Sequence, residues 1–182
     1  MDTTHRNSPE ENYRDLEAVE GTQKIREMAE QAKTCFMCTN GATGQSAGVR
    51  PMGIARADKD GTLWFISAND SHKNREIAAD PNVKLYFHGD QDADFLYVTG
   101  TATISEDKAI IKDLWQPPMK IWFTGGEDDP HLSAIRVTPD TGYYWDTKHG
   151  KVAFMIKSLI GVAMGKTLDD SIQGKIITTG EQ

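Results

Sequence analysis

The segment from Phe95 to Ser105 constrains the fold most, because its side chains alternate in character from one residue to the next. Leu96 and Val98 begin a series of apolar or small residues at every second position, while Tyr97 and three threonines occupy the positions between them. This period of two residues is that of a β-strand with one buried face. The sequence therefore predicts a long strand in a sheet that covers a core.

Other runs of the chain show strand patterns and are separated by tight-turn signals. Asn40-Gly41 and Asp60-Gly61 provide the positive φ that hairpin turns need. Because few helical segments intervene, we expect a mainly β fold with a closed or nearly closed antiparallel barrel. The predicted strands are Thr34–Thr39, Gly48–Ala57, Thr62–Ala68, Asn82–His88, Phe95–Ser105, Ser133–Val137 and Tyr143–Asp146.

Helical periodicity is confined to the two ends of the chain and to two segments between strands. Apolar residues from Asn12 onward predict two N-terminal helices, interrupted at Gly21 and with Thr22 as the cap of the second. Residues 1–11 are polar and are expected to form a disordered tail before a single domain at residues 12–182. The remaining predicted helices are Ser71–Asp80, Glu106–Leu114 and Val152–Ala163.

Charge and composition exclude several classes of protein. The 182 residues include 20 Lys and Arg against 27 Asp and Glu, a net charge of −7 that disfavours broad contact with nucleic-acid phosphates. The apolar stretch Ser158–Gly165 is far shorter than the roughly 20 residues of a membrane span. The first residues lack the apolar core of a secretory signal, and two cysteines give no disulfide framework. We therefore expect a cytoplasmic protein without nucleic-acid or membrane partners.

Ser71, His72 and Lys73 begin a predicted helix directly after a predicted strand. The start of a helix offers unpaired backbone N–H groups and the positive end of its dipole, so a phosphate fits this position. The alternative is an ordinary Ser71 N-cap beside a solvated lysine. These residues alone leave both interpretations open.

Arg50, Met52, Ile54 and Arg56 share one face of a predicted strand. If that face points inward, each arginine needs an anion or a carboxylate, because an unpaired buried charge is strongly unfavourable. If it points outward, the arginines are solvated and the two apolar residues are isolated on the surface.

Two other clusters contain residue types that occur in metal or redox sites. Cys35 and Cys38 are three residues apart in a predicted strand, so they point to opposite faces, and no second cysteine pair completes a metal cage. The acidic turn Glu127–His131 is expected to be solvated. No metal site is therefore expected. The aromatic residues of the second half suit core packing, a dimer interface or stacking on a planar cofactor.

Several motifs nevertheless occur together in a recognisable order. The run Leu63–Ile77, followed by Asp80–Val83, resembles the flavin-binding stretch of the pyridoxamine 5′-phosphate oxidase-like split barrels. Arg50-Pro51-Met52 resembles the arginine-led strand that precedes it in that family. The segments Trp122–Pro130 and Tyr144–Asp146 are most similar to the general stress protein 26 branch, and the resemblance covers about residues 23–166.

The resemblance implies a homodimer of six-stranded antiparallel split barrels that bind FMN, or alternatively FAD, between the subunits. It also implies roles for individual residues of this chain. Arg50 would contact the flavin phosphate or the ring edge, and Pro51 and Met52 would present their backbone to the isoalloxazine. Ile66 and Ser67 would touch the cofactor at a strand end, and Ser71, His72 and Lys73 would form the phosphate clamp. Trp145 would be the tryptophan that the partner subunit offers to the flavin.

The chain also departs from the vitamin-oxidising members of that family. His72 replaces an arginine of the phosphate clamp, and Ala55 stands where those oxidases have a substrate-binding lysine, with Arg56 one position further on. An apolar residue near Phe95 replaces a flavin-contacting glutamine, and Asp146–Lys151 lacks the family's Arg-x-His-Asp-Arg tail. The resemblance thus implies a flavin site without a pyridoxamine phosphate site.

Two functions are consistent with these residues. The first is a flavin-dependent oxidoreductase that acts on an unknown small substrate, with the hydride chemistry in the flavin ring. The second is a non-catalytic flavin-binding protein that stores or senses the cofactor under stress. The same residues bind flavin in both cases, and no catalytic acid or base stands out in the sequence.

Overall fold

The computed structural model describes residues 12–41, 48–89, 94–147 and 171–178 of the chain. The described strands are β1 (Leu16–Glu17), β2 (Thr34–Thr39), β3 (Val49–Gly53), β4 (Arg56–Ala57), β5 (Leu63–Ala68), β6 (Asn82–His88), β7 (Phe95–Ser105), β8 (Leu132–Thr147) and β9 (Ser171–Ile177). The described helices are α1 (Ala18–Ala32), α2 (His72–Ala79) and α3 (Lys108–Leu114), with the 3₁₀ turns η3 (Pro117–Ile121) and η4 (Gly126–Asp128).

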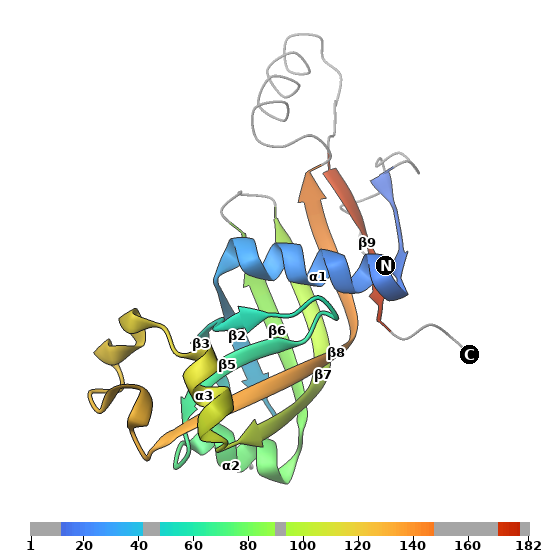
Figure 1. Ribbon diagram of the computed structural model, residues 1–182. Coiled ribbons are helices and arrows are strands. Elements are labelled where there is room, and N and C mark those ends of the chain that lie inside the picture. The colour runs from blue at the N-terminus through green and yellow to red at the C-terminus, as the bar shows by residue number, and fades with distance from the viewer. Residues whose placement is uncertain (1–11, 42–47, 90–93, 148–170, 179–182) are drawn as a thin grey trace, which may run out of the picture.

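All nine strands belong to one curved sheet, and α1 lies across its strands (Figure 1). The order is β1-β9-β8-β7-β6-β2-β3, with β4 paired to β5 beside this path, and among the described strand pairs only β1–β9 is parallel. The long strand β8 pairs with β7 along one edge; along the other it pairs first with β5 and then with β9. No ladder joins β3 to β5 within the described ranges, so the sheet is mixed and open there.

A mainly β fold with flanking helices is thus confirmed, and the predicted bounds of β2, β6 and β7 agree residue for residue. The predicted strand Gly48–Ala57 is wrong as a single element. Its backbone changes partners where Ile54 N donates to Lys33 O and Ala55 N donates to Trp64 O, which separates β3 from β4.

The two strands predicted on either side of Pro139 are one continuous strand, β8. Pro139 cannot donate to a sheet ladder, and a register shift at Thr99 and Gly100 of β7 accommodates it. A Cβ atom on Gly100 would lie 2.4 Å from Thr138 O, so the absence of a side chain permits this close approach.

The predicted interruption of the N-terminal helix at Gly21 is also wrong. Gly21 is buried inside α1, and Thr22 Oγ1 donates to Val19 O at 3.0 Å instead of capping a new helix. A Cβ atom on Gly21 would lie 2.8 Å from Ile176 Cγ2, so the glycine allows α1 to pack closely on β9. The sequence reasoning missed both β1 and β9.

The predictions for α2 and α3 are confirmed to within two residues, with Ser71 and Asp107 as their N-caps. The predicted tail at residues 1–11 and the predicted helix Val152–Ala163 lie outside the described residues. Among the helices that the structure describes, none has the length and apolar character needed to cross a membrane.

Two groups of buried side chains hold these elements together. The larger group joins α1 to the sheet and includes Ile25 of α1 together with strand residues such as Met37 and Phe65. The smaller group packs α3 on the start of β8 through Ile111, Leu114, Leu132 and Ala134. The segment that follows α3 is therefore anchored beside β5.

Candidate functional site

A cleft of about 890 Å³ opens where the chain passes from β3 to β4. Its walls are formed by Pro51–Ala57, by Ile66–Ala68 at the end of β5, by the C-terminal end of α1, and by η3 with Trp122 and Phe123. The volume lies within the range of about 300–1,000 Å³ that is typical of small-molecule sites. The cleft is therefore a candidate ligand site.

Several of the predicted site residues meet in this cleft. Pro51 and Met52 come from β3, Ile66 and Ser67 from β5, and Lys73 from the first turn of α2. The short connection from β5 into α2 brings the strand end and the lysine together. Ser71, His72, Arg50 and Trp145 do not line the cleft of this chain.

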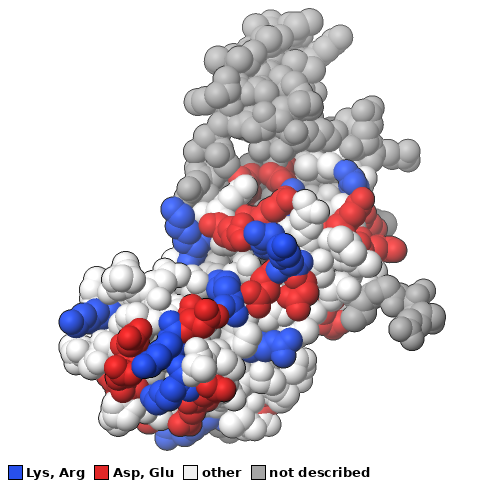
Figure 2. Space-filling view, in the orientation of Figure 1, with Lys and Arg blue, Asp and Glu red and all other residues white. Residues whose placement is uncertain are grey.

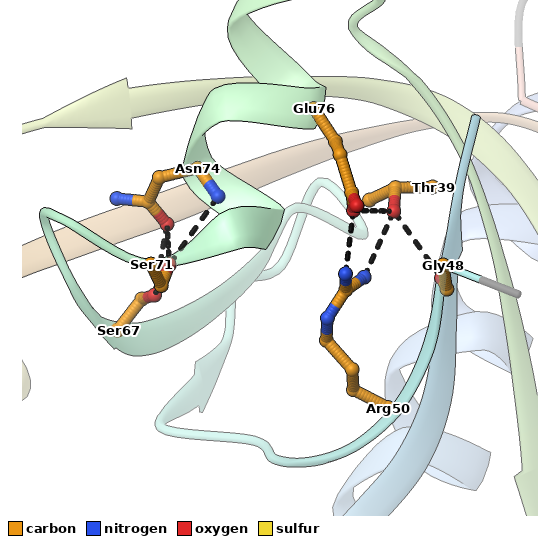
Figure 3. Close-up of polar contacts among 7 residues, drawn as sticks. All are labelled: Thr39, Gly48, Arg50, Ser67, Ser71, Asn74 and Glu76. Atoms are coloured by element: carbon orange, nitrogen blue, oxygen red, sulfur yellow. Dashed lines mark hydrogen bonds and ion pairs between the residues drawn. The ribbon is translucent and has the colours of Figure 1, made fainter. Parts of the chain in front are cut away.

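A network of buried polar side chains fixes the corner between β5 and α2 (Figure 3). Asn74 N donates to Ser71 Oγ at 3.3 Å, which caps the helix. Ser67 Oγ donates to Asn74 Oδ1 at 2.8 Å, and Asn74 Nδ2 donates to Ser133 Oγ at 2.8 Å. Because each group has a partner, α2 begins at one defined point. The Ser67 hydroxyl thereby stabilises the corner between β5 and α2.

Arg50 is held beside the cleft by two residues that the sequence reasoning missed (Figure 3). Its Nη2 donates to Glu76 Oε2 at 2.6 Å and its Nη1 donates to Thr39 Oγ1 at 2.9 Å. The Thr39 hydroxyl donates to Glu76 Oε2 at 2.6 Å. These hydrogen bonds, that from Thr39 first, lower the pKa of the Glu76 carboxyl below its usual value. Of the two partners expected for an inward-facing Arg50, an anion or a carboxylate, the structure shows a carboxylate.

The spacing of residues along the sequence could have identified Glu76 as a neighbour of the predicted clamp. Glu76 follows His72 by four residues and Lys73 by three on α2, so it lies on the same helix face. Thr39 gave no such local signal, because it reaches Arg50 only through the pairing of β2 with β3.

Lys73 differs from Arg50 because the described residues provide it with no hydrogen bond or ion pair. Its side chain is half-buried and lines the cleft. Burial, and secondarily the nearby charge of Arg50, lowers the pKa of the Lys73 ammonium. A bound anion would offset both effects. His72, in contrast, is exposed to solvent.

Arg56 lines another part of the cleft and is already neutralised. Its Nε lies 2.8 Å from Asp58 Oδ1, and its Nη1 forms an ion pair with Asp113 Oδ2. The guanidinium also lies over the Trp64 ring, 5.4 Å from its centroid. The predicted common face is thus not continuous, because Arg50 and Met52 belong to β3, Ile54 to the connection and Arg56 to β4. Both arginines are paired to carboxylates.

Trp145 lies on the outer face of β8, where 37% of its surface is exposed and its ring packs 4.6 Å from that of Tyr143. It is eleven residues along β8 from Ala134, the strand partner of Ile66. That separation is about 36 Å in an extended strand. Trp145 is therefore remote from the cleft of its own chain.

Several side chains of the two other candidate clusters are buried or engaged in contacts with protein groups. Burial raises the pKa of the Cys35 thiol to about 12, and burial also raises that of Cys38. In the acidic turn, Asp129 Oδ1 accepts a hydrogen bond from His131 N, and Asp128 pairs with Lys112. The described residues contain no group of three or more side chains suited to a metal ion.

Acidic and basic side chains are interspersed over α1 and α3 on the face shown in Figure 2. Five ion pairs have at least one partner on these helices and account for part of this mixture: Arg14 with Glu20, Arg26 with Glu30, Lys24 with Asp146, Arg56 with Asp113 and Lys112 with Asp128. On this face, the described residues form no extended run of basic side chains.

The family model of "pyridoxamine 5′-phosphate oxidase like" proteins matches residues 20–169, which is most of the chain. This chain belongs to the pyridoxamine 5′-phosphate oxidase-like family. The resemblance inferred from Arg50-Pro51-Met52 and Leu63–Ile77 is confirmed at that level.

This chain is also similar to a protein of a filamentous fungus. Protein bli-3 of Neurospora crassa is 30% identical over 123 residues, which cover 61% of this chain and 59% of that protein. This chain therefore spans less than two thirds of that relative's length.

Two solved structures share the fold. A Jannaschia sp. CCS1 protein named as a candidate general stress protein 26 superposes with a TM-score of 0.71 at 24% identity, over 86% of this chain and 97% of that chain. The general stress FMN/FAD binding protein of Xanthomonas citri gives a TM-score of 0.59 at 24% identity, over 69% of this chain and 88% of that chain.

Proposed function

We propose that this member of the pyridoxamine 5′-phosphate oxidase-like family binds FMN in the cleft between β3, β5 and η3. The observation that carries the proposal is Lys73, a half-buried cation that lines the cleft and for which the described residues provide no counter-ion. It lies in the first turn of α2, where backbone N–H groups lack intrahelical partners. A phosphate monoester fits both features.

The rest of the cleft suits the flavin ring system. Its exposed surface is predominantly apolar, and Pro51, Met52 and Ile66 lie along the strands next to Lys73. The Xanthomonas citri neighbour, described as FMN/FAD binding, supports a flavin as the ligand. FAD shares the same phosphate group, so the clamp alone does not discriminate between the two.

In this proposal the chain binds and orients the cofactor, and the flavin, once bound, supplies hydride or single-electron transfer. Lys73 neutralises the phosphate. Glu76 and Thr39 hold Arg50 by its two terminal nitrogens, which fixes the guanidinium beside that phosphate. Ser67 and Asn74 maintain the corner from which α2 starts.

We further propose that the functional unit is a homodimer of split barrels in which Trp145 of each subunit completes the flavin site of the other. Support comes from the distance between Trp145 and the cleft of its own chain. Support also comes from a row of outward-facing cross-strand neighbours, Pro51, Phe36, Tyr86, Tyr97 and Tyr143, that runs from the cleft to the strand carrying Trp145.

Pyridoxamine 5′-phosphate is not the expected substrate. Ala55 provides no cation, and the charge of Arg56 is taken up by Asp58 and Asp113. We therefore propose a flavin-dependent oxidoreductase of the general stress type that acts on another small molecule.

Purification of the protein tests whether FMN is the bound cofactor. Reduction of that flavin by a nicotinamide nucleotide distinguishes an oxidoreductase from a storage or sensing protein. The absorption spectrum and mass of the co-purified ligand should identify FMN. Bleaching of the flavin by NADH or NADPH, with recovery in oxygen, is expected of an oxidoreductase. Flavin that binds but resists both nucleotides would instead favour the storage or sensing function, and a protein that binds no flavin would refute the proposal.

A further inference from the structure

The cleft has a second wall that the cofactor proposal does not use. It consists of Pro118, Met119, Trp122 and Phe123, which come from η3 and the residues that follow it. Phe123 packs against Trp115, with the ring centroids 6.5 Å apart in an edge-to-face arrangement. This contact connects the wall to the small core beneath α3. The wall is therefore apolar, partly aromatic and anchored.

Charged groups are distributed unevenly around this cleft. Lys73 is assigned to the cofactor phosphate, and Lys33 is exposed to solvent at the rim, where its charge is screened. The remaining lining cation, Arg56, is paired with Asp58 and Asp113. Two carboxylates thus compensate the charge of this guanidinium, and neither of them lines the cleft.

An anionic group placed beside Arg56 would lose its hydration without gaining an unpaired cation, because that guanidinium already has two carboxylate partners. An uncharged aromatic ring meets no such penalty, and it gains contact with Met119 and Phe123. The two walls thus differ in the ligands they favour: an anion beside α2 and a neutral ring beside η3.

We propose that the η3 side of the cleft binds an uncharged, planar aromatic molecule as the substrate, and that the pairing of Arg56 with Asp58 and Asp113 leaves no free cation there to favour an anionic one. This inference rests on the proposed flavin site, because it assigns Lys73 to the cofactor. It adds the substrate class and makes Arg56, through its two carboxylate partners, a determinant of specificity.

Two probes of the same shape and different charge test the proposal. FMN-saturated protein is titrated by calorimetry with 2-naphthamide, which is neutral, and with 2-naphthoate, which is an anion. We expect the amide to bind at least about tenfold more tightly than the carboxylate.

Two sets of variants assign the preference to residues. Replacing both carboxylates, Asp58→Asn with Asp113→Asn, frees the charge of Arg56 and should abolish the preference for the amide probe. The substituted side chain at position 58 keeps a carbonyl oxygen that can accept from the Trp64 Nε1 donor, as the Asp58 carboxylate does. Met119→Ala should weaken binding of the amide probe about fivefold. Ile121→Ala is the matched control, because Ile121 belongs to the same turn, is 77% exposed and does not line the cleft.

The outcomes separate this inference from the cofactor proposal. FMN binding is measured first, and its absence overturns both. FMN-loaded protein that binds neither probe, or binds the anion as tightly as the amide, overturns the substrate class and leaves the flavin site standing. A preference that persists in the double variant refutes the role of the aspartates, and equal losses in the Met119 and Ile121 variants refute the role of the η3 wall.

Discussion

At the scale of single residues, Lys73 carries the cofactor proposal, and its removal is the direct test. Lys73→Ala deletes a charge-assisted contact worth about 1.5–3 kcal/mol, so the Kd for FMN should rise about 10- to 150-fold. Riboflavin lacks the phosphate, and its affinity should change little. Lys73→Arg keeps the charge and should keep most of the affinity. An unchanged Kd for FMN in the Lys73→Ala variant would show that the phosphate does not bind at the start of α2.

The lowered pKa of Lys73 also predicts how FMN binding depends on pH. Below that pKa the ammonium is already charged and the phosphate binds without proton uptake. Above it, binding must add a proton, so affinity falls by up to about tenfold per pH unit. Because burial and Arg50 lower the pKa, the decline should begin at lower pH than for an ordinary lysine. Titrations of FMN and riboflavin between neutral and alkaline pH measure it, and parallel curves for the two ligands would contradict it.

Glu76 predicts a pH effect on stability of the opposite sense. A carboxyl whose pKa is lower in the folded state stabilises the fold fully above its ordinary pKa, and this contribution is lost as pH falls through the folded-state value. At neutral pH, Glu76→Gln should lower the free energy of unfolding by about 1–3 kcal/mol.

Urea unfolding of wild-type and variant protein at pH 7 and pH 3 measures this effect, and the difference should shrink at the lower pH. Glu30→Gln is the control, since Glu30 forms only an exposed pair with Arg26 on α1 and should cost less than about 0.5 kcal/mol. A Glu76 variant no less stable than the Glu30 variant at pH 7 would show that the carboxylate does not hold Arg50 as described.

At the scale of elements, the sequence predicted what local patterning encodes and failed where tertiary contacts decide. Alternation over Phe95–Ser105 gave β7 without error, and the cap at Ser71 located α2 and with it Lys73. The break between β3 and β4 arises from hydrogen bonds to Lys33 and Trp64, which no local pattern reveals. Thr39 was missed for the same reason.

The error at Gly21 leads to a prediction about α1. On an exposed helix surface, Gly→Ala is stabilising by about 1 kcal/mol, because glycine disfavours helix. Here the new methyl group would lie 2.8 Å from buried Ile176 and 3.3 Å from two backbone oxygens of β1 and β9. We expect Gly21→Ala to destabilise the fold by about 1–3 kcal/mol as an overpacking change. Urea unfolding measures the difference, and a variant more stable than wild type would show that α1 can move away from β9.

At the scale of the whole molecule, one face of the sheet is unusually aromatic. Phe36 and Tyr86 are cross-strand neighbours with 55% and 45% of their surface exposed, and the row continues through Tyr97 and Tyr143. Trp145 lies on this same face, two residues beyond Tyr143. Aromatic side chains are enriched at protein interfaces, so a second copy of the chain is the partner we propose for this face.

If the flavin site is shared between two subunits, flavin affinity should depend on Trp145, which is remote from the cleft of its own chain. Trp145→Ala should weaken FMN binding by removing a contact from the partner, while Ile121→Ala, equally apolar and far more exposed, should not. The solution mass should be that of two chains. FMN at 100 times its Kd should add about 2.7 kcal/mol to stability, because it binds the folded dimer and not the unfolded chain. A monomer that binds FMN tightly would refute the shared site, whereas a dimer with unchanged affinity after Trp145→Ala would retain the assembly and reject only the role of this tryptophan.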